Sequence, residues 1–343
     1  MTSAVSSHHP SAPAADFGDV RGEFRALLSS CGIYDLSSRA KVEVTGSDRV
    51  RWLNGMVTNN VRDLASGHGV YAFLLNPQGH ILGDLYAYNR GDTLLLDIDQ
   101  SQLEKTLAHF GHYIIMDDVE VAHVSDKVAA IGIGGPRTPD ILKAAGLEVS
   151  ELAPLQFADT VWREIALTVV RGDNEKLPTF ELWLNPSALA SVWDALVKAG
   201  AQPVGNSALE LLRIALGIPR YGQDIRERDL PQETEQVRAL NFSKGCYIGQ
   251  EIVERIRSRG SVHRTFAGFR VQGGLPAAGT KIQAEGKDAG EITSVVSLPL
   301  SSGEFPFALG YIRREAAVPG KQLAADGTKI VVTSLPFAEA FKH

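Results

Sequence analysis

VYAFLLNPQGHILGDLYAYN, residues 70–89, holds two strand-like runs on either side of a turn. The turn is the tetrad Asn76-Pro77-Gln78-Gly79, which consists of residue types that favour tight turns. Outward from this hairpin, the chain alternates between strand and helix patterns. The strand patterns lie at 41–46, 93–99 and 118–124, and the helical patterns at 47–57 and 100–110. The order of strand, helix, three strands, helix and strand predicts a sheet covered by helices on one face.

A second round of the same kind follows. Its strand patterns lie at 128–135, 161–171 and 179–185, and its helical patterns at 138–146, 186–200 and 207–217. From His263 onward, short strand patterns separated by Gly and Pro turns predict a small antiparallel barrel or sandwich. We therefore expect an α+β protein with two α+β subdomains over residues 21–262, divided near residue 125, and a C-terminal β-barrel over residues 263–343.

The composition is that of a soluble globular protein. Of the 343 residues, 44% are hydrophobic and 22% are charged, and no apolar run is long enough to span a membrane. The formal net charge of -6 provides no positive field, so we expect no stable binding of nucleic acid. Residues 1–20 lack the features of a signal peptide and predict a disordered tail. Two cysteines are too few for a disulfide framework, which favours the cytoplasm.

The octet KGCYIGQE, residues 244–251, surrounds one of these cysteines with features of a reactive thiol. Gly245 and Gly249 permit a tight backbone path, Lys244 adds a positive charge, and a helical pattern follows. Such surroundings favour the thiolate, which attacks electrophiles and binds soft metals. The alternative is that Cys246 packs as an inert, small hydrophobic residue. The residues alone leave both interpretations open, and no other metal site is indicated.

Two strand patterns carry a carboxylate among aromatic residues. A period of two places Asp84 and Tyr86 on one face of the first strand. The same period places Glu181 and Trp183 on one face of the second. Carboxylate oxygens can accept hydrogen bonds from adjacent ring donors while aromatic rings stack on a flat heterocycle, a combination that suits a pterin. A solvated sheet face with scattered polar residues remains the alternative.

Arg255, Arg257 and Arg259 follow the octet at intervals of two residues. On an extended backbone, this spacing would place the three side chains on one face, where an anionic tail or a phosphate could dock. The alternative is a solvated edge.

These motifs together resemble a known family. The octet is similar to the signature of the YgfZ-type folate-binding proteins involved in iron-sulfur cluster maintenance. The aminomethyltransferase (T-protein) of the glycine cleavage system is a more distant relative of that family. Further segments resemble family landmarks in the family order: TGSDRVRWLNGMVTNNV at 45–61, GVYAFLLNPQGHILGDL at 69–85, LLRIALGIPRYGQDI at 211–225, LPQE at 230–233 and FALGYIRRE at 307–315.

The resemblance implies two interwoven, ferredoxin-like α+β subdomains and a C-terminal β-barrel arranged around a central folate pocket. It implies tetrahydrofolate or a polyglutamylated folate as the cofactor, and iron-sulfur client enzymes or assembly proteins as partners, with tRNA-modifying enzymes among the candidates. Cys246 would be a functional thiol or a transient cluster ligand, and Asp84 a second functional group. The residues expected to contact the folate are Asp84, Tyr86, Glu181, Trp183, Lys244, Gly245, Tyr247, Gly249, Gln250, Glu251, Arg255 and Arg257.

The chain also departs from the T-protein pattern. Gly83-Asp84 stands where T-proteins have two consecutive aspartates, and Leu209 stands where they have an arginine. T-proteins also lack the cysteine of the octet. Because transfer of an aminomethyl group needs a positioned acid, these differences disfavour that reaction. A tetrahydrofolate-dependent aminomethyltransferase or a demethylase-like one-carbon enzyme is the alternative to an accessory folate-binding protein.

Overall fold

The computed structural model describes residues 13–341 except 176 and 301, so most of the predicted N-terminal tail lies outside the described residues. The described residues form two compact units. Unit 1 holds the described residues up to Trp52 together with Val61–Val70 and Leu85–Leu209. Unit 2 holds Leu53–Asn60, Tyr71–Asp84 and the described residues from Glu210 onward. No described helix has the length and apolar character needed to cross a membrane.

The first predicted sheet has five strands in the order β3-β4-β5-β2-β6. Its strands are β2 (Arg39–Thr45), β3 (His68–Leu75), β4 (Ile81–Asn89), β5 (Leu94–Asp99) and β6 (Glu120–His123), and its helices are α2 (Arg49–Met56) and α3 (Leu103–Tyr113). The predicted order of elements is confirmed. In the register of the sheet, Asp97 lies opposite Lys41 on one side and Tyr86 on the other. These three side chains therefore share one face.

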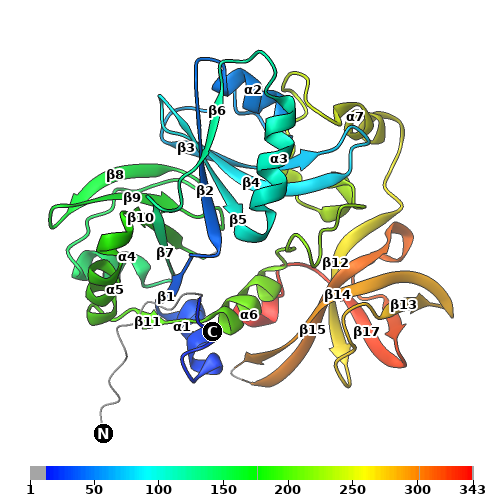
Figure 1. Cartoon of the computed structure of the whole chain (residues 1–343). Helices are drawn as coiled ribbons and strands as arrows, with labels where there is room; N and C mark the ends of the chain where they lie inside the picture. The colour runs from blue at the N-terminus through cyan, green and yellow to red at the C-terminus, as the bar shows by residue number, and fades with distance from the viewer. Residues whose placement is uncertain (1–12, 176, 301, 342–343) are drawn as a thin grey trace, which may run out of the picture. The chain divides into compact units, whose positions relative to one another are not determined.

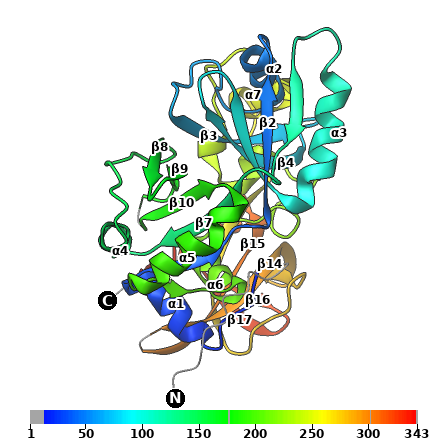
Figure 2. The same cartoon turned by 60° about the vertical axis from the view of Figure 1, so that its left-hand side comes forward.

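The second sheet has six strands in the order β11-β1-β7-β10-β9-β8. They are β1 (Gly32–Asp35), β7 (Ala129–Gly134), β8 (Phe157–Trp162), β9 (Ile165–Arg171), β10 (Thr179–Leu184) and β11 (Gln202–Pro203), with helices α1 (Val20–Ser29), α4 (Thr138–Ala144) and α5 (Leu189–Lys198). Side chains of α4 and α5 pack with those of β1, β7, β9 and β10 in one core. Figure 2 shows the two helices beside this sheet. Strand β1 precedes the first sheet in the sequence but pairs in the second, so the two subdomains are interwoven as expected.

One strand prediction in this sheet is wrong. Residues 161–171 are not a single strand, because β8 ends at Trp162 and β9 begins at Ile165. Arg163 and Glu164 between them have φ of 48° and 68°, the left-handed conformation that a tight hairpin turn requires. Neither residue is a glycine, asparagine or aspartate, so the sequence lacks the usual signal for this turn.

The C-terminal region is a closed barrel with the strand order β12-β15-β14-β13-β16-β17 (yellow to red in Figure 1). Its strands are β12 (Arg264–Gln272), β13 (Lys281–Ala284), β14 (Lys287–Leu300), β15 (Gly303–Arg313), β16 (Gln322–Ala325) and β17 (Thr328–Thr333). Because the sheet closes on itself, the C-terminal region is the predicted barrel and not the predicted sandwich. A closed sheet has no unpaired edge strand. Before the barrel come α6 (Asn206–Leu216), the 3₁₀ turns η3 (Pro231–Thr234) and η4 (Val237–Ala239), and α7 (Gln250–Arg259).

Candidate functional site

Glu181 lies on β10 in unit 1, on the face that the period of two predicted. Phe180, Leu182 and Leu184 point into the apolar core, while Glu181 and Trp183 occupy the other face. The Trp183 indole Nε1 donates a hydrogen bond of 2.8 Å to Glu181 Oε2. The Glu181 side chain keeps a quarter of its surface exposed. This carboxylate is therefore oriented by the indole and is still accessible to a ligand.

A buried ion-pair network supports Glu181, and we call Arg39, Lys41, Asp97 and Glu181 the carboxylate cluster. The Lys41 side chain is fully buried, and its Nζ lies 2.8 Å from Asp97 Oδ2 and 3.7 Å from Glu181 Oε2. Arg39 Nε donates to Asp97 Oδ1 at 2.7 Å. Lys41 Nζ also lies 4.9 Å from the centre of the Trp183 ring system. Since buried charges are stable only when paired, each member of the cluster depends on the others.

Within the cluster, the pKa values of the two carboxylates are shifted in opposite directions. Burial and the nearby charge of Asp97 raise the pKa of Glu181. Burial alone would also raise the pKa of Asp97, but Arg39 and Lys41 together lower it below its usual value. Glu181 is therefore the carboxylate that gains most from a further hydrogen-bond donor.

Aromatic side chains surround the cluster within unit 1. Tyr88 and Trp183 are buried and meet edge to face with a centroid distance of 4.9 Å. Tyr86 stacks on Tyr88 at 6.4 Å, and its hydroxyl donates to Asp173 Oδ2 at 2.9 Å. The predicted association of Glu181 with aromatic rings is thus present, and it includes Tyr86 from a strand far away in the sequence.

Asp84 belongs to unit 2, where Tyr71 holds its carboxylate. The Tyr71 hydroxyl donates to Asp84 Oδ2 at 2.6 Å, and the Arg238 guanidinium lies 4.4 Å from the centre of the Tyr71 ring. The Asn59 amide donates to the backbone carbonyls of Tyr71 and Arg238 at 2.8 and 2.9 Å. Asp84 is therefore oriented by a network that begins in the segment after α2.

Lys244 connects the octet to the same segment. Its side chain is buried, and Nζ donates to the carbonyls of Asn54, Val57 and Asn59 at 2.6, 2.6 and 2.7 Å. An ammonium group has three donors, so these contacts account for all of them. Lys244 thus anchors the octet to the C-terminal end of α2, a structural role that the sequence analysis did not predict.

The rest of the octet packs against the hairpin turn between β3 and β4. Gly249 has φ of 81°, and a Cβ there would lie 2.6 Å from the carbonyl oxygen of Asn76. Tyr247 is buried, and this burial raises the pKa of its hydroxyl to about 12. Gln250 accepts from the Tyr247 backbone N–H at 3.3 Å, and Glu251 is exposed in the first turn of α7. Gly249 thus serves the tight backbone path that was predicted, whereas a Cβ at Gly245 would meet no atom within 4 Å, and its φ is not positive.

Cys246 is exposed, whereas Cys31 is buried. Exposure excludes the alternative that Cys246 packs in an apolar core, and the reactivity of its thiol stays a prediction. Among the described residues, no group of three His, Cys, Asp or Glu side chains could hold a metal ion. The accessible thiol therefore has no metal site of its own in that part of the chain.

The expected alignment of the arginines is wrong. Residues 250–259 form the helix α7, so Arg255, Arg257 and Arg259 are not in an extended segment. Successive positions at intervals of two are about 200° apart on a helix, and the three side chains therefore do not share one face. Arg257 instead pairs with Glu254 at 3.3 Å and lies 4.9 Å from the centre of the Phe242 ring.

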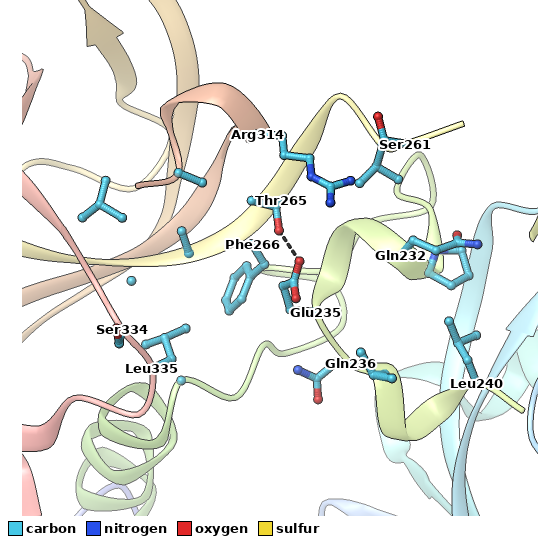
Figure 3. Close-up of a pocket in the computed structure, with 18 of the residues that line it drawn as sticks. Gln232, Glu235, Gln236, Leu240, Ser261, Thr265, Phe266, Arg314, Ser334 and Leu335 are labelled. Atoms are coloured by element: carbon cyan, nitrogen blue, oxygen red, sulfur yellow. Dashed lines mark hydrogen bonds between the residues drawn. The ribbon is translucent and has the colours of Figure 1, made fainter. Parts of the chain in front are cut away.

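A cavity of about 970 Å³ lies in unit 2 between the residues 231–242, the end of α7 and the barrel. Figure 3 shows Glu235 in the middle of this cavity, where its carboxylate accepts a hydrogen bond from Thr265. The volume suits a small organic ligand. Arg257 contributes to the lining, whereas Asp84 and Cys246 do not. This cavity therefore does not bring together the residues that the sequence analysis selected.

Comparison with protein families and known proteins agrees with this architecture. Residues 8–244 match the family model of the GCVT N-terminal domain, and residues 264–339 match that of the CAF17 C-terminal beta-barrel domain. The chain is 30% identical over 287 residues to a protein named aminomethyltransferase from Rubrobacter xylanophilus, covering 82% of this chain and 77% of that protein. A protein of the same name from Halothermothrix orenii is 29% identical over 309 residues, covering 88% and 85%.

A solved structure shares the fold. The crystal structure of the glycine cleavage system aminomethyltransferase T from Bartonella henselae matches with a TM-score of 0.83 at 22% identity. The match covers 94% of this chain and 90% of that chain. At this identity the likeness establishes the architecture alone.

Proposed function

This chain belongs to the GcvT-like family and carries a CAF17-type C-terminal barrel, and on that premise we propose that it binds a folate and supports the assembly or repair of iron-sulfur enzymes. We expect it to act in the cytoplasm, with iron-sulfur client enzymes or assembly proteins as partners and tRNA-modifying enzymes among the candidate clients. Tetrahydrofolate or a polyglutamylated folate is the proposed cofactor.

The observation that carries the folate proposal is the carboxylate cluster. Glu181 offers a partly exposed carboxylate, oriented by Trp183 and kept in place by the buried Lys41. A pterin has adjacent N–H donors on a flat ring, which are matched by a carboxylate and by aromatic side chains such as Trp183 and Tyr86. This donor and acceptor set fits the cofactor. When bound, the folate would supply a one-carbon carrier or a redox-active pteridine.

In unit 2, Asp84 and the octet supply the remaining proposed groups. Asp84 is oriented by Tyr71, and the anchored octet presents the accessible Cys246 thiol. We assign Asp84 to recognition of the folate and Cys246 to a redox step or to transient ligation of a cluster. One thiol cannot hold an iron-sulfur cluster alone, so such ligation needs a partner protein or a small-molecule thiol.

Cys246→Ala should leave the fold intact and abolish the ability of the gene to restore iron-sulfur enzyme activity in a strain that lacks the protein. The side chain is exposed, so its removal costs little stability. The measurement is the activity of a cellular iron-sulfur enzyme, with expression levels compared by immunoblot. Ser243→Ala, an exposed change three residues before Cys246, is the matched control and should restore activity fully. Full restoration by Cys246→Ala would remove the thiol from the mechanism.

A second candidate function is folate-dependent one-carbon transfer, because the relatives compared above are named aminomethyltransferase. Asp84 would be the positioned acid in that case. Incubation of the full chain with tetrahydrofolate and an aminomethyl or methylamine donor separates the two functions. Catalytic turnover would favour the transferase, and binding without turnover would favour the accessory role.

A further inference from the structure

A second cleft, of about 490 Å³, lies on the barrel side of unit 2, and we call it the barrel cleft. Its walls come from the beginning of β12, from β13 and β14, from the end of β15 and from the segment before η3. The residues that matter for its chemistry are Arg228, Arg264, Lys281, Glu291, Tyr311 and Arg313. The barrel cleft shares no residue with the carboxylate cluster or the octet. Its chemistry is therefore independent of the proposed function.

Positive charge exceeds negative charge around Glu291. Its carboxylate faces three cations: Arg226 at 2.6 Å, Lys281 at 3.2 Å and Arg228 at 3.6 Å. One carboxylate balances one of these charges, so two remain without a counter-charge from Glu291. The cleft also contains Arg313 and Asp288, which add one charge of each sign. An additional anion would therefore lower the electrostatic free energy of this group of side chains.

The acids on the other side of the cleft are already paired. Arg264 Nη2 lies 2.6 Å from Asp229 Oδ1 and 2.8 Å from Glu233 Oε2. Both carboxylates are largely buried, and the Arg264 guanidinium also lies 4.8 Å from the centre of the Tyr311 ring. Asp229 Oδ2 also lies 3.9 Å from Arg226 Nε. These acids are therefore engaged with Arg264 and Arg226, and among the described residues neither of them forms an ion pair with Arg228 or Lys281.

Buried donors without an acceptor lie in the same region. The Tyr311 side chain is 1% exposed and lines the cleft, yet among the described residues its hydroxyl has no hydrogen-bond partner. Burial and the charge of Asp229 raise the pKa of Tyr311, so the hydroxyl stays protonated and remains a donor. Nε and Nη2 of Arg226 are likewise buried, and neither has an acceptor within hydrogen-bond distance in the part of the chain that the structure describes. A buried donor without an acceptor destabilises the folded protein, because it has given up its hydrogen bonds to water. A ligand that supplies an acceptor would remove this cost.

We propose that the barrel cleft binds an oxyanion, a phosphate or carboxylate group of a small acidic molecule. Its oxygens accept from the Tyr311 hydroxyl and are attracted by Arg228, Lys281 and Arg313. Phosphate and carboxylate share this chemistry, since both present several acceptor oxygens and negative charge to guanidinium and ammonium groups. The volume of the cleft leaves room for more than the anionic group itself.

Calorimetric titration of the full chain with inorganic pyrophosphate and, separately, with tri-glutamate tests this proposal and identifies the preferred group. We expect saturable binding of at least one probe that weakens as salt is added. Lys281→Gln and Arg228→Gln should each weaken it roughly tenfold or more. Lys329→Gln, an exposed lysine of the same barrel outside the cleft, is the matched control and should leave the affinity unchanged.

Tyr311→Phe separates binding from folding. The variant keeps the ring contacts with Phe266 and Arg264 and removes only the unpaired hydroxyl, so the melting temperature should not fall. The affinity for the probe should nevertheless fall roughly tenfold. The proposal is overturned if neither probe binds saturably at millimolar concentration, if Lys329→Gln weakens binding as much as Lys281→Gln, or if Tyr311→Phe lowers the melting temperature and leaves the affinity unchanged.

Discussion

Lys41→Met should lower the free energy of unfolding by about 3–5 kcal/mol, the range for breaking a fully buried ion pair. The variant keeps most of the volume and apolar contacts of the lysine stem. It removes the ammonium that lies 2.8 Å from Asp97 and 3.7 Å from Glu181, and the side chains at this position and at Asp97 are almost completely inaccessible. Two carboxylates would then lie in the same buried region with only Arg39 to balance them. Chemical denaturation followed by circular dichroism measures the loss.

Lys143→Met is the matched control in the same unit, since Lys143 is exposed on α4. It should change the free energy of unfolding by less than about 0.5 kcal/mol. If Lys41→Met were as stable as Lys143→Met, the carboxylate cluster would not be a paired, buried network.

Lys244→Met should cost a similar amount, about 3–5 kcal/mol, for a different reason. The ammonium group satisfies the carbonyls of Asn54, Val57 and Asn59, and its removal leaves three acceptors without their charged donor. Hydrogen bonds to charged groups contribute about 1.5–3 kcal/mol each, although the values do not add fully. The denaturation midpoint should shift strongly, and proteolysis should become faster in the octet because its anchor is lost.

The control for this variant is Lys287→Met, an exposed lysine at the beginning of β14. It should leave both the midpoint and the rate of proteolysis unchanged. Equal stability of the two variants would mean that Lys244 does not anchor the octet. Its side chain would then again be a candidate for direct contact with the folate.

The faces of β4 and β10 could be predicted because burial follows a period of two. Along β4, Ile81, Gly83 and Leu85 are buried while Leu82 and Asp84 are only half-buried. Along β10, the alternation separates the core residues from Glu181. Such patterns establish the strand and its polar face, which is why both carboxylates could be selected from the sequence.

Lys41 and Asp97 were missed because their meeting depends on strand register. Lys41 reads as an ordinary polar residue in the alternating pattern KVEVTG, and no local feature pairs it with Asp97 more than fifty residues later. Only the pairing of β2 with β5 brings them opposite each other. The apolar run LLLDID was a usable signal, since an aspartate within such a run needs a buried cation as its partner.

The arginine prediction failed for a local reason. The helical pattern that begins in the octet has no breaker before Gly260, so α7 continues through Arg255, Arg257 and Arg259. Strand β1 was missed because four residues are too few to show a period. The α+β class and the C-terminal barrel were nevertheless predicted, since repeated strand and helix patterns over many residues outweigh such local errors.

Calorimetric titration of tetrahydrofolate into the full chain and into Glu181→Gln is the most direct test of the central claim that the Glu181 carboxylate recognises a folate. The wild-type chain should bind saturably, and the variant should bind about 10–100-fold more weakly, the loss of one charge-assisted hydrogen bond. Glu164→Gln, an exposed change in the β8-β9 turn, should match the wild type. Equal affinity of Glu181→Gln and the wild-type chain, or no binding by the wild-type chain, would contradict the assignment.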